Sequence, residues 1–485
     1  MNSKIAKGFV WKLLERFGVQ GVQFILQVIL ARLLDPEHYG VLSLMLIFIT
    51  LANVFIQNGF NTALIQNKDV TEEDYSSVFW VTLVISIILY CVVFAAAPFI
   101  GEFYRMPNIV WPLRAIALVL IPGAFNSVQL AKVSKEMDFR KVFFSNIGGI
   151  LISGIVSIVL AFMGAGLWAL VVQYLLNIVV ACIVMFFTVK WVPRFIINWT
   201  RIKVLFSFGW KLLVSGLLDT LYQDLRSLVI GKKYDSSTLG YYNRGKQFPQ
   251  FIVNAVNGTV QSVMLPAMSE KQENLQSVKV LTRHSIMIST YIMMPLMAGL
   301  AGVATSTVSL LLTDKWLPCV PYMRIYCFSL AFYPVHSCNL QAINAVGRSD
   351  IFLKLEIVKK MIGVGSLIIA VFCFDSPIAI AMTGMLTTLI SCFINAFPNK
   401  RLINYSYIEQ MRDILPSFSL SIVMFVIVLL IERLHFSYFA MLVIQVVTGG
   451  FFYIFFSFLF KLEPFRIIME MTKRFIKTGF GKVRG

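Results

Sequence analysis

Long apolar runs, separated by short polar segments, recur along the whole of this sequence. Each run is about 20 residues long, the length of helix that crosses the apolar core of a bilayer. The runs are continuously apolar and do not alternate, which excludes a transmembrane β-barrel. The pattern predicts an all-α integral membrane protein with about fourteen transmembrane helices. The predicted spans are 9–31, 41–65, 77–98, 112–131, 142–163, 166–189, 205–231, 241–266, 284–304, 319–344, 356–374, 377–397, 413–431 and 436–460.

Composition supports the same class. Of the 485 residues, 58% are hydrophobic and only 14% are charged, against about 25% charged in an ordinary soluble domain. Too few polar side chains are present to cover soluble domains of this total length. A water-soluble globule, a disordered chain and a fibrous protein are therefore excluded.

The chain is basic, with 42 Lys and Arg against 24 Asp and Glu and a formal charge of +18. Nucleic-acid binding does not fit a chain that lies mostly in lipid. Lys and Arg concentrate in alternate loops, as the positive-inside rule describes for cytoplasmic connections. We therefore expect a bacterial inner-membrane protein with both termini in the cytoplasm. This requires an even number of spans, and twelve is the alternative if the last two predicted spans do not cross.

The first spans recur later in the chain. Phe9-Val-Trp-Lys-Leu-Leu14 opens the first span, and Phe208-Gly-Trp-Lys-Leu-Leu213 opens the seventh. Asp35-Pro-Glu-His-Tyr-Gly40 similarly matches Tyr234-Asp-Ser-Ser-Thr-Leu-Gly240 with one inserted residue. Two parallel six-helix repeats are expected to enclose a cleft between two lobes. The predicted domains are an N-terminal lobe (1–200), a C-terminal lobe (201–400), two additional helices (401–460) and a basic cytoplasmic tail (461–485). The tail could instead form an amphipathic helix at the membrane surface.

Polar side chains follow one face of several predicted spans. The eighth span carries six amides at steps of four and three, which a helix places in one line. The first and seventh spans also carry polar side chains at helical spacing, and the second span adds three more amides. These positions are Asn243, Gln247, Gln250, Asn254, Asn257 and Gln261; Lys12, Arg16, Gln20, Gln23 and Gln27; Lys211, Ser215, Asp219, Tyr222, Gln223 and Arg226; and Asn53, Gln57 and Asn61.

Polar side chains that face lipid are costly, so these lines must face protein or water. Any single amide could simply hold two helices together. The lines as a set, on the first two helices of each repeat, favour a solvated central cavity. Four cations lie within or beside them, namely Arg16, Arg226, Arg244 and Lys246. Glu15, Asp219 and Asp224 could pair with these cations or couple transport to an ion.

The sequence contains no catalytic signature. We find no GxSxG, HExxH, Walker or glycine-rich nucleotide motif. The seven cysteines form no CxxC pair and the four histidines are scattered, so neither a disulfide framework nor a metal site is predicted. No cofactor and no cleaved signal peptide are expected. The protein is therefore expected not to be an enzyme.

Three segments resemble the Wzx-type polysaccharide flippases, of the polysaccharide transporter family in the multidrug/oligosaccharidyl-lipid/polysaccharide exporter superfamily. They are WKLLERFGVQGVQFILQVILARLLDPEHYGVLSL, NGFNTALIQNKDVTEEDYSSVFW and INAVGRSDIFLKLEIVKK, which begin at Trp11, Asn58 and Ile343. The colanic-acid and lipopolysaccharide-biosynthesis subgroup is most similar. The resemblance covers essentially the whole chain, including its arrangement as six, six and two spans.

This resemblance implies translocation of undecaprenyl-pyrophosphate-linked oligosaccharides for O-antigen, capsule or exopolysaccharide synthesis, by alternating access. Partners would be membrane lipids, a polysaccharide polymerase and a chain-length regulator. Cationic residues can hold a diphosphate, and amides can hydrogen-bond sugar hydroxyls. Expected diphosphate ligands are Arg16, Arg226, Arg244 and Lys246, and the sugar path would be lined by Gln20, Gln23, Gln27, Asn243, Gln247, Gln250 and Asn254.

Three other functions compete with this hypothesis. A cation-coupled multidrug antiporter of the same superfamily would favour an acidic cavity, whereas cations predominate here. A lipid II flippase would share the cationic cavity. A membrane scaffold would not need polar lines that cross the bilayer.

Overall fold

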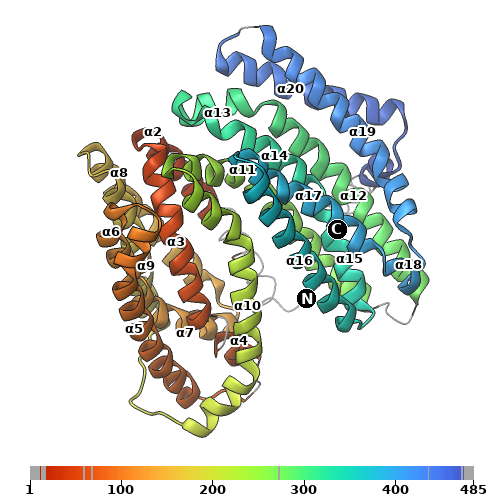
Figure 1. Ribbon diagram of the computed structural model, residues 1–485. Helices are drawn as coiled ribbons and strands as arrows, with labels where there is room; N and C mark the ends of the chain where they lie inside the picture. Colours follow the sequence, from red (N-terminus) through yellow and green to blue (C-terminus); the bar gives the residue numbers. More distant parts are fainter. Residues whose placement is uncertain are drawn as a thin grey trace, which may run out of the picture. The chain divides into compact units, whose positions relative to one another are not determined.

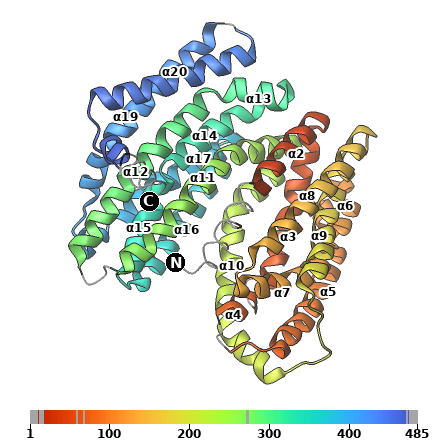
Figure 2. The same cartoon turned by 180° about the vertical axis from the view of Figure 1, so that it is seen from behind.

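Helices form all of the regular structure in the described part of the chain (Figures 1 and 2). The computed structural model describes residue 11 and residues 18–57, 60–66, 69–270, 274–434, 436–470 and 473. Two compact units divide the chain, Met1–Gly240 and Tyr241–Gly485. The predicted fold class, an all-α integral membrane protein, is confirmed.

The first unit is a bundle of packed helices. Within it α5 packs on α7, α8 packs along α9, and α10 packs on α3, α4 and α5. Its elements are α2 (Gln20–Leu33), α3 (Pro36–Gln57), α4 (Phe60–Gln66), α5 (Glu72–Phe103), η2 (Pro107–Ile109), α6 (Val110–Ala117), α7 (Leu120–Glu136), α8 (Phe139–Phe162), α9 (Leu167–Val189), α10 (Trp199–Lys233) and the first turn of α11 (Ser236–Glu270).

The second unit contains the rest of α11 and a bundle in which α12 packs along α19 and α14 packs on α12 and α17. The remaining elements are α12 (Leu275–Gly302), α13 (Ala304–Leu312), η3 (Asp314–Cys319), α14 (Val320–Ala331), α15 (Tyr333–Ala345), α16 (Ser349–Cys373), α17 (Pro377–Ala396), α18 (Asn399–Leu402), α19 (Tyr407–Ile431), η4 (Glu432–Leu434) and α20 (Tyr438–Leu459).

Nine helical segments in the described part of the chain are long and apolar enough to cross a membrane. They are α3 with α4, α5, the stretch from η2 to α7, α8, α9, α12, α17 with α18, α19 with η4, and α20. Helix α10 is a tenth if its two parts, bent by 49°, form one span. Helices also lie in the described parts of the other predicted spans, but α2, α14 and α15 are each short. Helix α11 is rich in polar residues, and α16 carries the charged residues Glu356, Lys359 and Lys360 beside its apolar stretch. The total of fourteen spans stays a prediction.

The contact between α8 and α9 shows how the bundle suits a bilayer. The Ser145 hydroxyl donates to the Ala181 carbonyl at 2.8 Å, and a Cβ on Gly149 would lie 2.8 Å from the Asn177 carbonyl oxygen. Large apolar side chains lie outside, with Ile155 64% and Phe162 74% exposed. Small residues thus face the neighbouring helix and large apolar ones face outward, as expected for helices packed in lipid.

Capping residues in the loops mark where two of the long helices begin. Thr71 accepts from the Asp74 amide while the Asp74 carboxylate accepts from the Thr71 amide, and Ser406 and Glu409 form the same capping box at α19. Each box satisfies backbone donors that the first helical turn leaves without partners. The two boxes also place a carboxylate in the first turn of each helix, where it forms an ion pair.

Candidate functional site

Helix α11 carries the predicted amide line. Asn243, Gln247, Gln250 and Asn254 follow one another at helical spacing on one face. Gln247 and Asn254 are exposed, and Asn243 and Gln250 are half-buried. The Gln250 Nε2 donates to Asn254 Oδ1 at 3.0 Å. This face therefore offers both hydrogen-bond donors and acceptors.

Arg244 is held at the start of this line. Its side chain is only 5% exposed, and its Cζ lies 5.0 Å from the centroid of the Trp316 ring, which is fully buried. Nη1 of Arg244 donates to Gln247 Oε1 at 2.6 Å. A cation over a desolvated Trp face gains about 2 kcal/mol. Arg244 thus has a defined orientation beside the amides, with the half-buried Lys246 next to it.

Close packing seats the start of α11 on η3 and α14. A Cβ on Gly245 would lie 2.7 Å from Tyr322 Cβ and 2.8 Å from the Cys319 carbonyl oxygen. The Tyr242 ring meets the Tyr322 ring edge-on at 5.8 Å, and its hydroxyl contacts the Tyr326 hydroxyl. Only glycine permits this approach, which brings Trp316 of η3 beneath Arg244.

The first unit carries the other predicted residues. On α2, Gln20 and Gln27 are half-buried and Gln23 is exposed. Helix α2 packs on α8, where a Cβ on Gly154 would lie 2.0 Å from Leu26 Cδ1. Glu15 and Arg16 lie outside the described residues.

Helix α10 carries the predicted ionisable groups of the seventh span. Asp219 is exposed, and Asp224 and Arg226 are half-buried. The Arg226 Cζ lies 6.0 Å from the centroid of the Tyr222 ring, one turn away on the same helix. The predicted residues thus divide between α2 and α10 in the first unit and α11 in the second.

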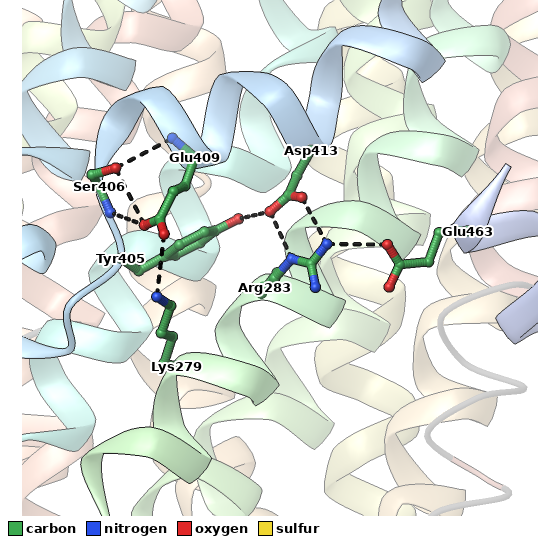
Figure 3. A network of polar contacts seen from close by, with 7 residues as sticks. All are labelled: Lys279, Arg283, Tyr405, Ser406, Glu409, Asp413 and Glu463. Carbon is green, nitrogen blue, oxygen red and sulfur yellow. Dashed lines mark hydrogen bonds and ion pairs between the residues drawn. The ribbon is translucent and has the colours of Figure 1, made fainter.

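A network of charged groups joins α12 to α19 in the second unit (Figure 3). Arg283 donates from Nε and Nη2 to the two carboxylate oxygens of Asp413, both at 2.9 Å. Its Nη2 also contacts Glu463 at 3.0 Å, and the Tyr405 hydroxyl donates to Asp413 Oδ2 at 2.8 Å. Lys279 lies 3.4 Å from Glu409. Burial and the neighbouring Asp413 carboxylate raise the pKa of Tyr405 above its usual range.

The first unit has a comparable ion pair with the charges exchanged. Here the acid, Asp74, lies on α5, and Arg201 at the start of α10 donates to its two oxygens at 2.8 and 2.6 Å. The Asp74 side chain is 1% exposed. Trp191 Nε1 also donates to Glu72 at 2.8 Å. In each predicted repeat, the ion pair joins the third helix to the helix that comes after the sixth. These helices are α5 and α10 in the first repeat, and α12 and α19 in the second.

Sequence reasoning missed these partners. No pattern in the sequence distinguishes Arg201 and Arg283 from the other basic residues of the loops, or points to a role for Trp316. The pattern Thr71-Glu-Glu-Asp74 signals a capping box, so an acidic helix start could have been predicted. Nothing in the sequence identifies the Arg that pairs with it, because that residue lies 127 positions away.

The described residues offer no metal-binding chemistry. Within the described part of the chain, no group of three or more His, Cys, Asp or Glu is suited to a metal ion, and all seven cysteines are free. The chemistry available along α2, α10 and α11 is that of amides, carboxylates and cations. Such groups bind polar or anionic cargo by hydrogen bonds and charge.

The described helices are those of a multi-span membrane protein, and α2, α10 and α11 carry polar groups among them. The lipid II flippase MurJ, solved in an inward closed conformation, has a similar fold, with a TM-score of 0.73, 15% identity, and coverage of 94% of this chain and 98% of that one. The chain belongs to the polysaccharide biosynthesis protein family, whose model matches residues 29–321. It is a transporter of the Wzx-type flippase family and not an enzyme.

Two relatives illustrate the family. The succinoglycan biosynthesis transport protein ExoT of Rhizobium meliloti (strain 1021) is 21% identical, over 86% of this chain and 82% of its own length. The lipopolysaccharide biosynthesis protein WzxC of Escherichia coli (strain K12) is 20% identical, over 82% of each. The resemblance read from the sequence is therefore confirmed.

Proposed function

We propose that this protein moves undecaprenyl-pyrophosphate-linked oligosaccharide units across the bacterial inner membrane for surface polysaccharide synthesis. The cargo would be loaded on the cytoplasmic side and released on the periplasmic side by alternating access of two homologous lobes. Membership of the polysaccharide biosynthesis protein family supports this class of cargo. A polysaccharide polymerase and a chain-length regulator would act on the product.

The single observation that carries the proposal is that α11 holds a cation, Arg244, hydrogen-bonded to its line of amides. Arg244 lies over Trp316 and hydrogen-bonds to Gln247, the second amide of a line that continues to Asn254. A guanidinium suits a diphosphate because its fork of N–H groups matches phosphate oxygens. Amides suit sugar hydroxyls because they donate and accept hydrogen bonds. One helix therefore offers groups for the head of the cargo and for its sugars.

We assign roles on this basis. Arg16, Arg226, Arg244 and Lys246 would contact the diphosphate. The amides Gln20, Gln23, Gln27, Asn243, Gln247, Gln250 and Asn254 would line the sugar path. Glu15, Asp219 and Asp224 would couple transport to an ion or neutralise the cations between cycles. Because Arg244 is almost covered in this structure, it would contact cargo only after α11 shifts relative to its neighbours.

The test is complementation of a deletion strain that has lost its surface polysaccharide. Arg226→Gln and Arg244→Gln should each abolish export while the protein stays at normal abundance in the membrane. Arg433→Gln provides a matched control, since Arg433 is exposed in η4 and outside the proposed site. Full export in both site variants would overturn the diphosphate role.

The same strain separates the competing functions. Accumulation of undecaprenyl-linked oligosaccharide on the cytoplasmic side supports the proposal. Cell lysis with accumulation of lipid II would instead indicate a peptidoglycan precursor as cargo. Drug sensitivity with intact polysaccharide would indicate a multidrug antiporter.

We also propose that both termini lie in the cytoplasm and that the lobes correspond to residues 1–200 and 201–400, followed by two further helices (401–460) and a basic tail (461–485). The distribution of Lys and Arg supports this orientation. A reporter enzyme fused after Lys461 tests it. Periplasmic activity of that fusion would reverse the proposed topology.

A further inference from the structure

The end of α5 and the start of α6 form a tight hairpin within the first unit. In the turn, Arg105 has a φ of 56° and the Met106 amide donates to the Gly101 carbonyl oxygen at 2.8 Å. A left-handed residue with such a hydrogen bond ends many helices. A Cβ on Gly101 would lie 3.0 Å from Val110 Cγ2. The turn thus returns the chain close along α5, on which α6 packs.

One face of α5 is apolar and exposed as far as the end of the helix. Ile88 and Val92 are each 56% exposed, and Phe99 is 73% exposed. At helical spacing these residues lie on one side, in a line of exposed positions from Val84 to Phe103. A continuous apolar face on a membrane-spanning helix is a surface for lipid chains. Acyl chains are therefore expected to cover this face.

Arg114 of α6 lies at the edge of this face, where three contacts hold its guanidinium. Its Nε donates to the Phe94 carbonyl oxygen at 3.2 Å, and its Cζ lies 4.1 Å from the centroid of the Phe94 ring. The Trp111 ring centroid lies 5.0 Å from the same Cζ. Phe94 is 37% and Trp111 66% exposed. Two aromatic rings and a carbonyl therefore fix this cation at the surface of the unit.

These contacts occupy only one of the three nitrogen atoms of the guanidinium. Among the described residues, no acceptor lies within hydrogen-bond distance of Arg114 Nη1 or Nη2, and no carboxylate forms an ion pair with this side chain. A cation within a membrane-spanning segment needs such a partner. The open fork of N–H groups matches the oxygens of a phosphate.

The depth of Arg114 corresponds to the lipid headgroups. Phe94 lies four residues before the end of the predicted span 77–98, and Arg114 lies two residues after the start of the span 112–131. Both are thus within about 6 Å of the same end of the apolar segment, measured along a helix. Trp residues gather at this depth, and Arg side chains reach from it toward the headgroups.

The surroundings of Arg114 favour an anionic headgroup. Lys232 of α10 lies 3.9 Å from the centroid of the Phe103 ring and contacts the Phe103 carbonyl. Arg105 is exposed in the turn. At this end of α5, Arg105, Arg114 and Lys232 outnumber the exposed acid Glu102. A zwitterionic lipid would bring a second positive charge close to these cations.

We propose that Arg114 binds the headgroup phosphate of an anionic phospholipid whose acyl chains lie along the exposed face of α5. All of the residues involved belong to the first unit. The site therefore depends neither on the placement of the second unit nor on the proposed cargo. Phosphatidylglycerol, whose only charge lies on its phosphate, is the probe.

A photoreactive residue beside Arg114 tests the proposal. Leu118→p-benzoylphenylalanine places the probe one turn from Arg114, at a position that is 41% exposed. The matched control is the same replacement of Val159, which is 52% exposed near the end of α8. Successive spans alternate in direction, so this end of α8 lies at the same membrane surface. The full chain is illuminated in nanodiscs of equal parts phosphatidylglycerol and phosphatidylcholine, and the lipid adducts are identified by mass.

At Leu118 the ratio of phosphatidylglycerol to phosphatidylcholine adducts should exceed the bilayer ratio by about fivefold, as expected for one cation at an anionic lipid. At Val159 it should equal the bilayer ratio. Arg114→Gln should abolish the enrichment, whereas Arg105→Gln, which removes a nearby exposed cation, should keep most of it. Equal enrichment in Arg114→Gln and in the wild type would overturn the site.

The probe in the otherwise unchanged chain remains decisive even if Arg114→Gln fails to fold. The bilayer ratio at Leu118 in that chain would overturn the proposal by itself. Illumination in native membranes identifies the natural occupant. Phosphatidylglycerol adducts there support the proposal, whereas undecaprenyl-linked adducts in their place would overturn a phospholipid as the occupant.

Discussion

Arg283 of α12 and Asp413 of α19 form a two-point ion pair, with both N···O distances at 2.9 Å (Figure 3). The pair between Asp74 and Arg201 has the same geometry, but there the acid lies on the third helix of the repeat and the base on the helix that follows the sixth. The repeats have thus kept the position of the link and exchanged its charges. The two helices are joined equally well whichever of them carries the acid and whichever carries the base.

The Arg283–Asp413 link should contribute measurably to stability. Arg283→Gln would leave Asp413, whose side chain is 11% exposed, without its main partner. The expected loss is on the order of 1–3 kcal/mol, between the values for exposed and for buried pairs. Thermal unfolding in detergent measures it. Arg283→Lys should lose less, because it keeps the charge but not the two-point geometry. An unchanged melting temperature in Arg283→Gln would contradict this.

Trp316 should matter for export through Arg244. Trp316→Phe keeps an aromatic face beneath the guanidinium, whereas Trp316→Leu removes it. We expect near-normal export for the Phe variant and a loss like that of Arg244→Gln for the Leu variant, compared at equal membrane abundance. Surface polysaccharide is measured in the complemented deletion strain. Equal export by both variants would show that the ring serves packing alone.

Gly245 should not tolerate a methyl group. Gly245→Ala would place a Cβ within 2.9 Å of backbone or Cβ atoms of Cys319, Tyr322 and Met323, and overpacking of this kind costs about 1–3 kcal/mol. Gly365→Ala on α16 is the control, because a Cβ there would have no heavy atom within 4 Å. The control should be neutral or stabilised by about 0.5–1 kcal/mol. Melting temperatures that fall equally in both variants would contradict the assignment.

A buried amide cluster should hold α15 to the segments that follow α17. Asn339 donates to Gln410 at 2.8 Å and accepts from Gln410 and Asn399 at 3.0 and 2.6 Å, and all three side chains are fully buried. Asn339→Leu would leave amide groups of both neighbours without this partner, at a cost of about 1–3 kcal/mol. Thermal unfolding tests this. Wild-type stability in Asn339→Leu would mean that the neighbours find other partners.

Hydropathy along the chain is enough to predict the fold class and the course of most helices. Hydropathy is a local property, so the expected span at 142–163 corresponds closely to α8, Phe139–Phe162. The amide line of α11 could also be predicted, because it depends only on the helical period.

Which residues meet depends on how the helices pack in three dimensions. Trp316 lies under Arg244 although 72 positions separate them in the sequence, and Arg283 pairs with Asp413 across 130 positions. Charge and aromatic character are visible in a sequence, but partnership depends on how helices dock. In this protein docking follows from small residues such as Gly245 and Gly149, whose effect is to remove a side chain and let two backbones approach, and no hydropathy pattern records that.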